Sequence, residues 1–175
     1  MNANSEIWQN ETGNDYIVPA ETCIGHVHLR VSDLGKSLKF YQDLLGFQLT
    51  TLYGDQAAFI SAGGYHHHIG LNTWHSKDAP PASRQGVGLY HVAIKYPTRK
   101  DLAVILDRLR KSKYPLSGAS DHGVSEALYL NDPDNNGIEL YWDRPRPEWP
   151  YNADGSIAMV TLPLDLVALL KELEQ

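Results

Sequence analysis

Two histidines and one glutamate stand at equivalent places in three strand-like segments of the chain. His26 lies in GHVHLRV, His91 in LYHVAIKY and Glu139 in GIELYWD. Aliphatic residues alternate with these three positions, and successive side chains of a strand point to opposite faces of its sheet. If the aliphatic faces pack under helices, His26, His91 and Glu139 project together from the opposite, concave face.

Two imidazoles and one carboxylate are the ligand set of mononuclear Fe(II) sites, which leave adjacent coordination positions open. Mn(II), Zn(II) and Ni(II) accept the same ligand types, so the spacing does not select the metal. A single histidine on a strand is more often a hydrogen-bonded core or surface residue than a ligand. An inward glutamate is harder to explain in that way, because burying an unpaired carboxylate is costly. On the residues alone, a metal site and three separate structural roles both remain open.

A βαβββ unit that occurs twice in the sequence is expected to position these residues. Alternating hydrophobicity indicates the strands, and apolar residues at helical spacing after a capping residue indicate the helices. In the first unit Ser32 or Asp33 begins the helix and Gly46 ends it, and in the second unit Thr98 begins the helix. The expected strands are 24–31, 47–52, 57–62 and 66–74 in the first unit, and 89–96, 116–120, 126–131 and 137–143 in the second.

The duplication predicts an α+β fold, in which paired βαβββ modules form an open mixed-sheet half-barrel with a concave metal site. Neither unit can close a core alone. We expect a polar N-terminal arm over residues 1–22, one domain over 23–144 with modules of about 23–76 and 87–144, and a C-terminal tail over 145–175. The tail begins as a proline-rich strap and ends in a short amphipathic helix, which must pack on the domain or on a partner because it is marginal alone.

Composition excludes several classes of partner. The 175 residues carry a net charge of −6 and have no basic stripe that could neutralise phosphates, so a nucleic-acid partner is not expected. No run approaches the roughly 20 apolar residues of a membrane-spanning helix. Cys23 is the single cysteine, which favours a reducing compartment, and the polar N-terminus does not have the pattern of a signal peptide. We therefore expect a cytoplasmic protein.

Three strings of the sequence, GHVHLRVSDLGKSLKFYQDLLGF, LYHVAIKY and LYLNDPDNNGIELYWDRP, resemble the vicinal oxygen chelate superfamily. Its members include glyoxalases, extradiol ring-cleaving dioxygenases, and fosfomycin- and bleomycin-resistance proteins. The resemblance covers about residues 24–144. In that family the metal ligands come from the first strand of each module and from the last strand of the second, which implies the same roles for His26, His91 and Glu139.

Two further segments are most similar to the catechol 2,3-dioxygenase group of the superfamily. In GGYHHHIGLNTW, His67 matches the acid–base histidine, although strand alternation also allows His66 together with His68 to face the pocket. In DHGVSEALYLNDPDNNGIELY, Tyr129 matches the pocket tyrosine and His122 a second histidine near the substrate. The resemblance implies Fe(II)-dependent cleavage of a small aromatic diol with O₂. A histidine titrates near neutrality and can accept and return the proton of a hydroxyl group, while a tyrosine can hydrogen-bond a developing oxygen anion.

The same fold also hosts a glyoxalase-type isomerase, an antibiotic-modifying transferase, and a non-catalytic small-molecule binding protein. Glyoxalases use a fourth protein ligand, usually Glu, on the strand that corresponds to residues 66–74, where this sequence has no carboxylate. The metal-free binding proteins have no need of the three ligands. Relatives with the GGYHHHIGLNTW segment typically have two such domains. Either a second subunit replaces the other domain, in which case we expect a homodimer, or the single domain indicates a different or lost activity.

Overall fold

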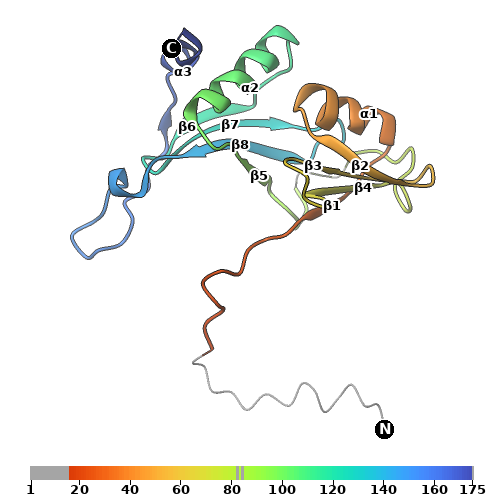
Figure 1. Cartoon of the computed structure of the whole chain (residues 1–175), viewed down its shortest axis with the longest axis horizontal. Coiled ribbons are helices and arrows are strands. Elements are labelled where there is room, and N and C mark those ends of the chain that lie inside the picture. Colours follow the sequence, from red (N-terminus) through yellow and green to blue (C-terminus); the bar gives the residue numbers. More distant parts are fainter. Residues whose placement is uncertain (1–15, 82, 84, 175) are drawn as a thin grey trace.

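The computed structural model describes residues 16–81, 83 and 85–174 (Figure 1). The predicted N-terminal arm lies largely in residues 1–15, outside the described part of the chain, and residues 16–22 are exposed and leave the domain beside β1. Two βαβββ modules follow, as predicted. The elements of the first module are β1 (Val27–Arg30), α1 (Leu34–Leu38) with a π-helical continuation (Lys39–Leu44), β2 (Gln48–Tyr53), β3 (Ala57–Ser61) and β4 (Ile69–Asn72).

The second module repeats this order, and its sheet gains a strand from the C-terminal tail. Its elements are β5 (Val92–Lys95), α2 (Arg99–Lys111), β6 (Gly118–Asp121), β7 (Ser125–Asn131) and β8 (Gly137–Asp143). The tail supplies a 3₁₀ turn (Arg146–Glu148), β9 (Leu162–Pro163), α3 (Leu166–Leu170) and a final 3₁₀ turn (Lys171–Glu174).

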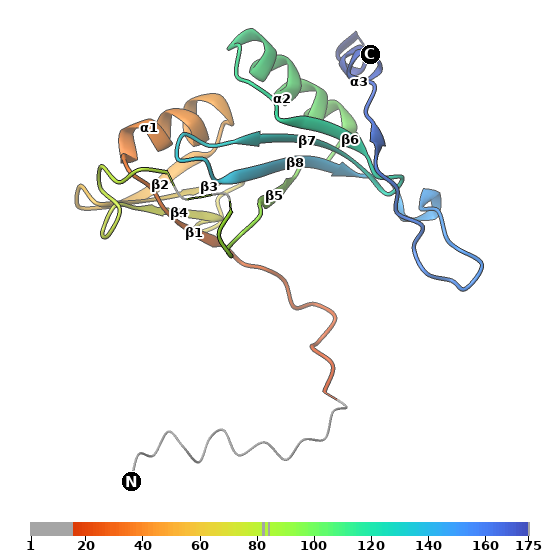
Figure 2. The ribbon, with the colours of Figure 1, turned by 180° about the vertical axis from the view of Figure 1, so that it is seen from behind.

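The two mixed sheets are equivalent in topology and remain open. Their strand orders are β1-β4-β3-β2 and β5-β8-β7-β6-β9, with β1 parallel to β4 and β5 parallel to β8. Figures 1 and 2 show α1 and α2 on the same side of the two sheets, so the candidate residues belong to the other side. The sheets do not close into a barrel, which agrees with the predicted half-barrel.

Both helix starts follow from their capping residues. Asp33 caps α1, since its side chain accepts a hydrogen bond from the Lys36 N–H at 2.9 Å, and Thr98 caps α2 by accepting from Asp101 N–H. The first helix ends at Gly46 as predicted, with φ at +91°. Its second half differs from the prediction because the hydrogen bonds change to the wider π-helical spacing, and Leu45 N–H bonds to Phe40 O.

The strands predicted over 24–31, 66–74 and 89–96 are shorter in the structure, which leaves His26 and His91 just outside their strands, and one strand was not predicted. The strand predicted over 66–74 is only Ile69–Asn72, because the chain bends at 66–68, where the His68 ring turns back to Ser61 and to the N–H of Ala62. The fifth strand of the second sheet, β9, was not predicted at all. Its two residues pair with Ser120 and Asp121, and so short a strand containing a proline has no alternating pattern to detect.

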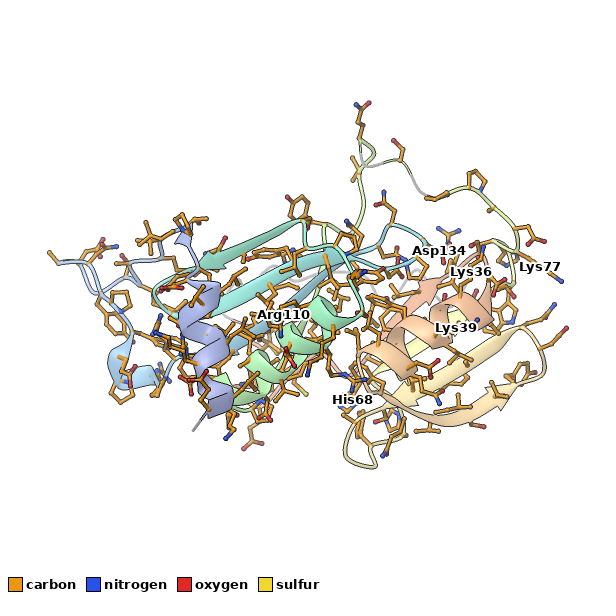
Figure 3. All side chains as sticks on the ribbon, turned by 90° about the horizontal axis from the view of Figure 1, so that it is seen from above. Lys36, Lys39, His68, Lys77, Arg110 and Asp134 are labelled. Carbon is orange, nitrogen blue, oxygen red and sulfur yellow. The ribbon has the colours of Figure 1, made fainter. Side chains whose placement is uncertain are left out.

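One hydrophobic core joins the modules beneath the helices. Tyr41 of the first module is fully buried, and its hydroxyl donates to Asp132 Oδ2, in the β7–β8 turn of the second module, at 2.9 Å. Ser32 N–H donates to Asp134 of the same turn, which Figure 3 shows beside the first helix and its Lys36. Burial raises the pKa of Asp132 above its ordinary value, while hydrogen bonds from Asn136 and Tyr41 act in the opposite direction.

The rest of this core is aliphatic and aromatic, and it includes the tail. Leu169 of α3 is fully buried against it, so the short C-terminal helix packs on its own domain. None of the helices in the described residues is long and apolar enough to cross a membrane.

Replacing Tyr41 with Phe should lower the free energy of unfolding by about 1–3 kcal/mol, because the buried Asp132 loses a hydrogen-bond donor. Chemical denaturation followed by circular dichroism measures this change. Tyr53→Phe is the matched control, since Tyr53 is 70% exposed and its replacement should change stability by less than about 0.5 kcal/mol. Equal stabilities of the two variants would show that the Tyr41–Asp132 bond does not hold the modules together.

Candidate functional site

The two candidate histidines lie at edge strands, and the candidate glutamate lies in an interior strand. His26 and His91 immediately precede β1 and β5, each of which is the first strand of its module and an edge of its sheet. Glu139 lies in β8 between the buried Ile138 and Leu140, so its side chain leaves the sheet on the side away from the helices.

The histidine of the second module contacts the glutamate directly. His91 Nε2 lies 2.9 Å from Glu139 Oε2, and the two side chains are only 31% and 13% exposed. Gly137 makes this approach possible: a Cβ at that position would lie 2.2 Å from Tyr90 O and 3.1 Å from His91 Cβ. Any larger residue at 137 would force the segment that carries His91 away from β8.

The donor types and one of the distances fit a bound metal ion. Two ligands at right angles about an ion, each ~2.1 Å from it, are about 3 Å apart, as His91 Nε2 and Glu139 Oε2 are. The other ring nitrogen of His91 is buried and has no hydrogen-bond partner among the described residues. His26 is not placed with this pair, and the described residues contain no cluster of three or more His, Cys, Asp or Glu side chains that could hold an ion.

His26 packs against His67. The ring centroids of His26 and His67 are 4.4 Å apart, and Phe59 of β3 approaches His67 edge-on at 5.0 Å. His67 Nδ1 also lies 2.8 Å from His66 Nδ1, so one of these nitrogens donates and the other accepts. Of the three consecutive histidines, His67 is the one that is partly covered and directed at His26, while His66 and His68 are exposed. Partial burial, and then the nearby imidazoles of His26 and His66, lower the pKa of His67.

His28 shares the face of His26, two residues away along β1. Its ring lies over Gly70 of β4, where a Cβ would come within 2.9 Å of it, and beside the rings of Phe59 and Trp74 at 5.7 and 5.6 Å. Burial and the nearby His26 lower its pKa. This aromatic layer forms one wall of the concave face.

Glu139 is the start of a chain of hydrogen bonds. Tyr129, its directly opposed neighbour on β7, places its hydroxyl 3.1 Å from Glu139 Oε1 and 2.7 Å from His122 Nε2. Burial first, and then the charge of Glu139 and the hydrogen bond to it, raise the pKa of Tyr129 well above the ordinary tyrosine value. The structure thus brings Tyr129, His122, Glu139 and His91 together in the second module, and His26 with His67 in the first.

Sequence reasoning missed the groups that hold this chain of bonds in place. His122 Nδ1 bonds to the backbone carbonyl of Val160 at 2.8 Å, and a backbone carbonyl has no sequence signature. The other missed feature is a network of ion pairs around Glu126, whose side chain is only 4% exposed and bonds to Arg99 and Arg144. Arg99 also bonds to Glu172 of the tail at 2.6 Å. The charged residues of these ion pairs lie on elements that are far apart in the sequence. No sequence pattern indicates which acidic residue pairs with which arginine.

Fold and site together define the class of protein. A family model for the glyoxalase/bleomycin resistance protein/dioxygenase superfamily matches residues 23–140. A glyoxalase/dioxygenase structure from Nostoc punctiforme superimposes with a TM-score of 0.60 over 75% of this chain and 99% of that chain, at 18% identity, and shows the shared fold. The chain belongs to this superfamily.

Among curated proteins, the chain is similar to several ring-cleaving dioxygenases. It is 41% identical to a catechol-2,3-dioxygenase of Bacillus subtilis (strain 168), over 87% of this chain and 52% of that protein. It is 31% identical to biphenyl-2,3-diol 1,2-dioxygenase 3 of Rhodococcus globerulus, over 69% of this chain and 63% of that protein. An iron-dependent extradiol dioxygenase of Rhodococcus jostii (strain RHA1) is 28% identical over 70% of this chain and 44% of that protein. The matched region therefore spans between 44% and 63% of the length of these relatives.

Glu139→Gln should lower the pKa of Tyr129 in the metal-free chain, because the carboxylate charge no longer opposes ionisation of the phenol. The pKa should stay above the ordinary tyrosine value, since the larger cause, burial, is unchanged. Titration of ¹³C-labelled tyrosine by NMR measures it, with Glu148→Gln on the tail as the control substitution. An unchanged Tyr129 pKa would mean that the two groups do not interact in solution.

Proposed function

We propose that this chain is an extradiol ring-cleaving dioxygenase that uses Fe(II) and O₂ to open a small aromatic diol. The observation that carries the proposal is the Glu139 cluster, in which one carboxylate contacts His91 and, through Tyr129, His122. The 41% identity to a catechol-2,3-dioxygenase and the similarity to an iron-dependent extradiol dioxygenase support the same reaction class.

In this proposal His26, His91 and Glu139 hold the metal. Two imidazoles and a carboxylate suit Fe(II), and Mn(II), Zn(II) or Ni(II) would also bind to such ligands. Bound Fe(II) supplies the electron chemistry that O₂ requires and a positive charge that favours ionised diol oxygens.

The side chains around the metal ligands then accept or donate hydrogen bonds and orient the substrate. His67 lies on the ligand His26, and its lowered pKa favours the neutral imidazole, which can accept a proton from a hydroxyl of the substrate. Tyr129 keeps its proton far above neutral pH, so its hydroxyl stays a hydrogen-bond donor to the groups around it, His122 and Glu139. Phe59 and the rings beside it offer an apolar surface for an aromatic substrate.

A non-catalytic small-molecule binding protein is the second candidate function. It is favoured by the family match, because the superfamily whose model matches residues 23–140 includes bleomycin resistance proteins as well as dioxygenases. A glyoxalase-type isomerase is less consistent with the chain, since β4 and the residues flanking it carry no carboxylate that could be a fourth ligand.

Metal binding separates the two candidates. Isothermal titration with Fe(II) under nitrogen, or with Mn(II), should show one ion per chain. Saturating metal at 100 times its Kd should raise the free energy of unfolding by about 2.7 kcal/mol, and a chelator should reverse this. His26→Ala, His91→Ala and Glu139→Ala should each weaken binding by at least about tenfold, or about 1.4 kcal/mol. His75→Ala, at an exposed position, is the control. A chain that binds no metal would support the binding-protein function instead.

Turnover tests the reaction itself. Protein reconstituted with Fe(II) without oxygen is mixed in air with catechol, 2,3-dihydroxybiphenyl and hydroquinone, and O₂ uptake and yellow ring-fission products are recorded. His67→Phe should bind the metal normally but lose activity by about 10²–10⁴-fold, because the proton acceptor is gone. His75→Phe, at an exposed position, should retain activity. No uptake with any diol would refute the dioxygenase proposal, and full turnover by His67→Phe would remove that residue from the mechanism.

A further inference from the structure

The segment that follows β8 leaves the second module and returns to it. Proline-rich residues 145–150 turn the chain outward, and it comes back to pair along the outer edge of β6 as β9 (Figure 2). We call residues 145–161 the strap. Beyond β9 the segment is fixed by the buried Leu169 and by the bond between Arg99 and Glu172. Both ends of the strap are therefore anchored to the second module.

The returning strap contacts the β6–β7 turn through reciprocal hydrogen bonds. Val160 N–H donates to the backbone oxygen of His122 at 3.1 Å, and the Val160 carbonyl faces His122 Nδ1 at 2.8 Å. Thr161 Oγ1 is a more distant neighbour of the same nitrogen, at 3.4 Å. The strap packs closely here, because a Cβ on Gly123 (φ +77°) would lie 3.2 Å from Pro150 Cγ and 3.5 Å from Val160 Cγ2.

These contacts determine which nitrogen of His122 carries the proton. A carbonyl oxygen can only accept a hydrogen bond, so Nδ1 must be protonated to bond to Val160. In the neutral imidazole Nε2 is then an acceptor, and Tyr129, whose hydroxyl is 2.7 Å away, must donate to it. That hydroxyl has one proton, and its other neighbour, at 3.1 Å, is Glu139 Oε1. His122 and Glu139 therefore compete for the same proton.

The opposite tautomer would reverse the direction of these bonds. If Nε2 carried the proton, it would donate to the Tyr129 oxygen, and the Tyr129 O–H would turn to Glu139. A carboxylate that accepts this bond is a weaker electron donor to a metal ion than one that does not. The bonding state of Glu139 therefore depends on the far side of His122, where the strap lies.

We propose that the Val160 carbonyl of the strap is a positioning group of the active site: it holds His122 as the Nδ1–H tautomer, so that the Tyr129 O–H donates its hydrogen bond to His122 Nε2 and is directed away from Glu139. The assignment of the tautomer rests only on the contacts of His122 with Val160 and Tyr129. Its importance for turnover rests on the proposed dioxygenase function.

Tautomers are observed directly in the metal-free full chain by long-range ¹H–¹⁵N NMR of labelled histidine, in mildly alkaline buffer. His122 should show a protonated Nδ1 and an unprotonated Nε2. Val160→Pro removes the N–H that keeps the carbonyl in register with His122, and the preference for Nδ1–H should be lost. Thr161→Val, which alters only the 3.4 Å contact, should preserve it. An Nε2–H tautomer in the unaltered chain, or an unchanged tautomer in Val160→Pro, would overturn the proposal.

Tyr129→Phe distinguishes the strap from the tyrosine as the source of the preference, and it serves as well if Val160→Pro does not fold. Because the strap remains in place, His122 should keep its proton on Nδ1 in this variant. A change to Nε2–H would show that Tyr129 and not Val160 sets the tautomer, which is incompatible with the proposal.

The consequence for turnover is measured with the Fe(II)-loaded full chain. In His122→Asn the amide nitrogen can replace Nδ1 and keep the bond to Val160, but no acceptor remains for Tyr129. We expect kcat to fall about 10- to 100-fold with little change in KM, while hydrogen exchange at the Val160 amide stays slow. Wild-type kcat in this variant would refute a positioning role. A chain inactive toward every diol would instead refute the proposed function, and the tautomer results would still decide the strap proposal.

Discussion

In β1, β5 and β8 only alternate side chains face the helices, and this constraint places the candidate residues. Each sheet covers one face with a helix, so the aliphatic residues of its strands must face that helix. The residues between them, which include Glu139 and Tyr141 on β8, are then forced to the opposite side. The polar and aromatic groups lie on the concave face because the aliphatic side chains of the core occupy the face under the helices. A shift of one residue in either first strand would bury a histidine and expose the core.

The same constraint explains which parts of the fold could be predicted from the sequence. β8 extends over the predicted residues, and α2 begins at its predicted cap Thr98, because both carry a strong periodic pattern and a clear boundary. The shorter β4 and the π-helical turn after Leu38 depend on contacts between residues that are distant or irregular in spacing. β9 is defined by pairing with β6 and not by its own two residues.

The candidate site could likewise be predicted from the sequence only in part. Parity predicted a common face for His91 and Glu139, which are in contact in the structure, and family resemblance added Tyr129 and His122, which the structure joins to that carboxylate. Parity says nothing about distance across the gap between two modules, and His26 lies with His67 instead of with His91. The Val160 carbonyl could not have been predicted, since every residue has one, and only the path of the chain selects which of them meets His122.

The contacts of the strap can form only late in the synthesis of the chain. Val160 lies 38 residues beyond His122, so β9 is synthesised after all the other strands of its sheet. A nascent chain that has left the ribosome only as far as β8 already contains His26, His91, Glu139 and Tyr129. At that stage the imidazole of His122 has no bond to Val160 and can adopt either tautomer. The candidate site residues and the group that fixes the His122 tautomer are therefore synthesised at different times. The tautomer can be fixed only after the tail has been made.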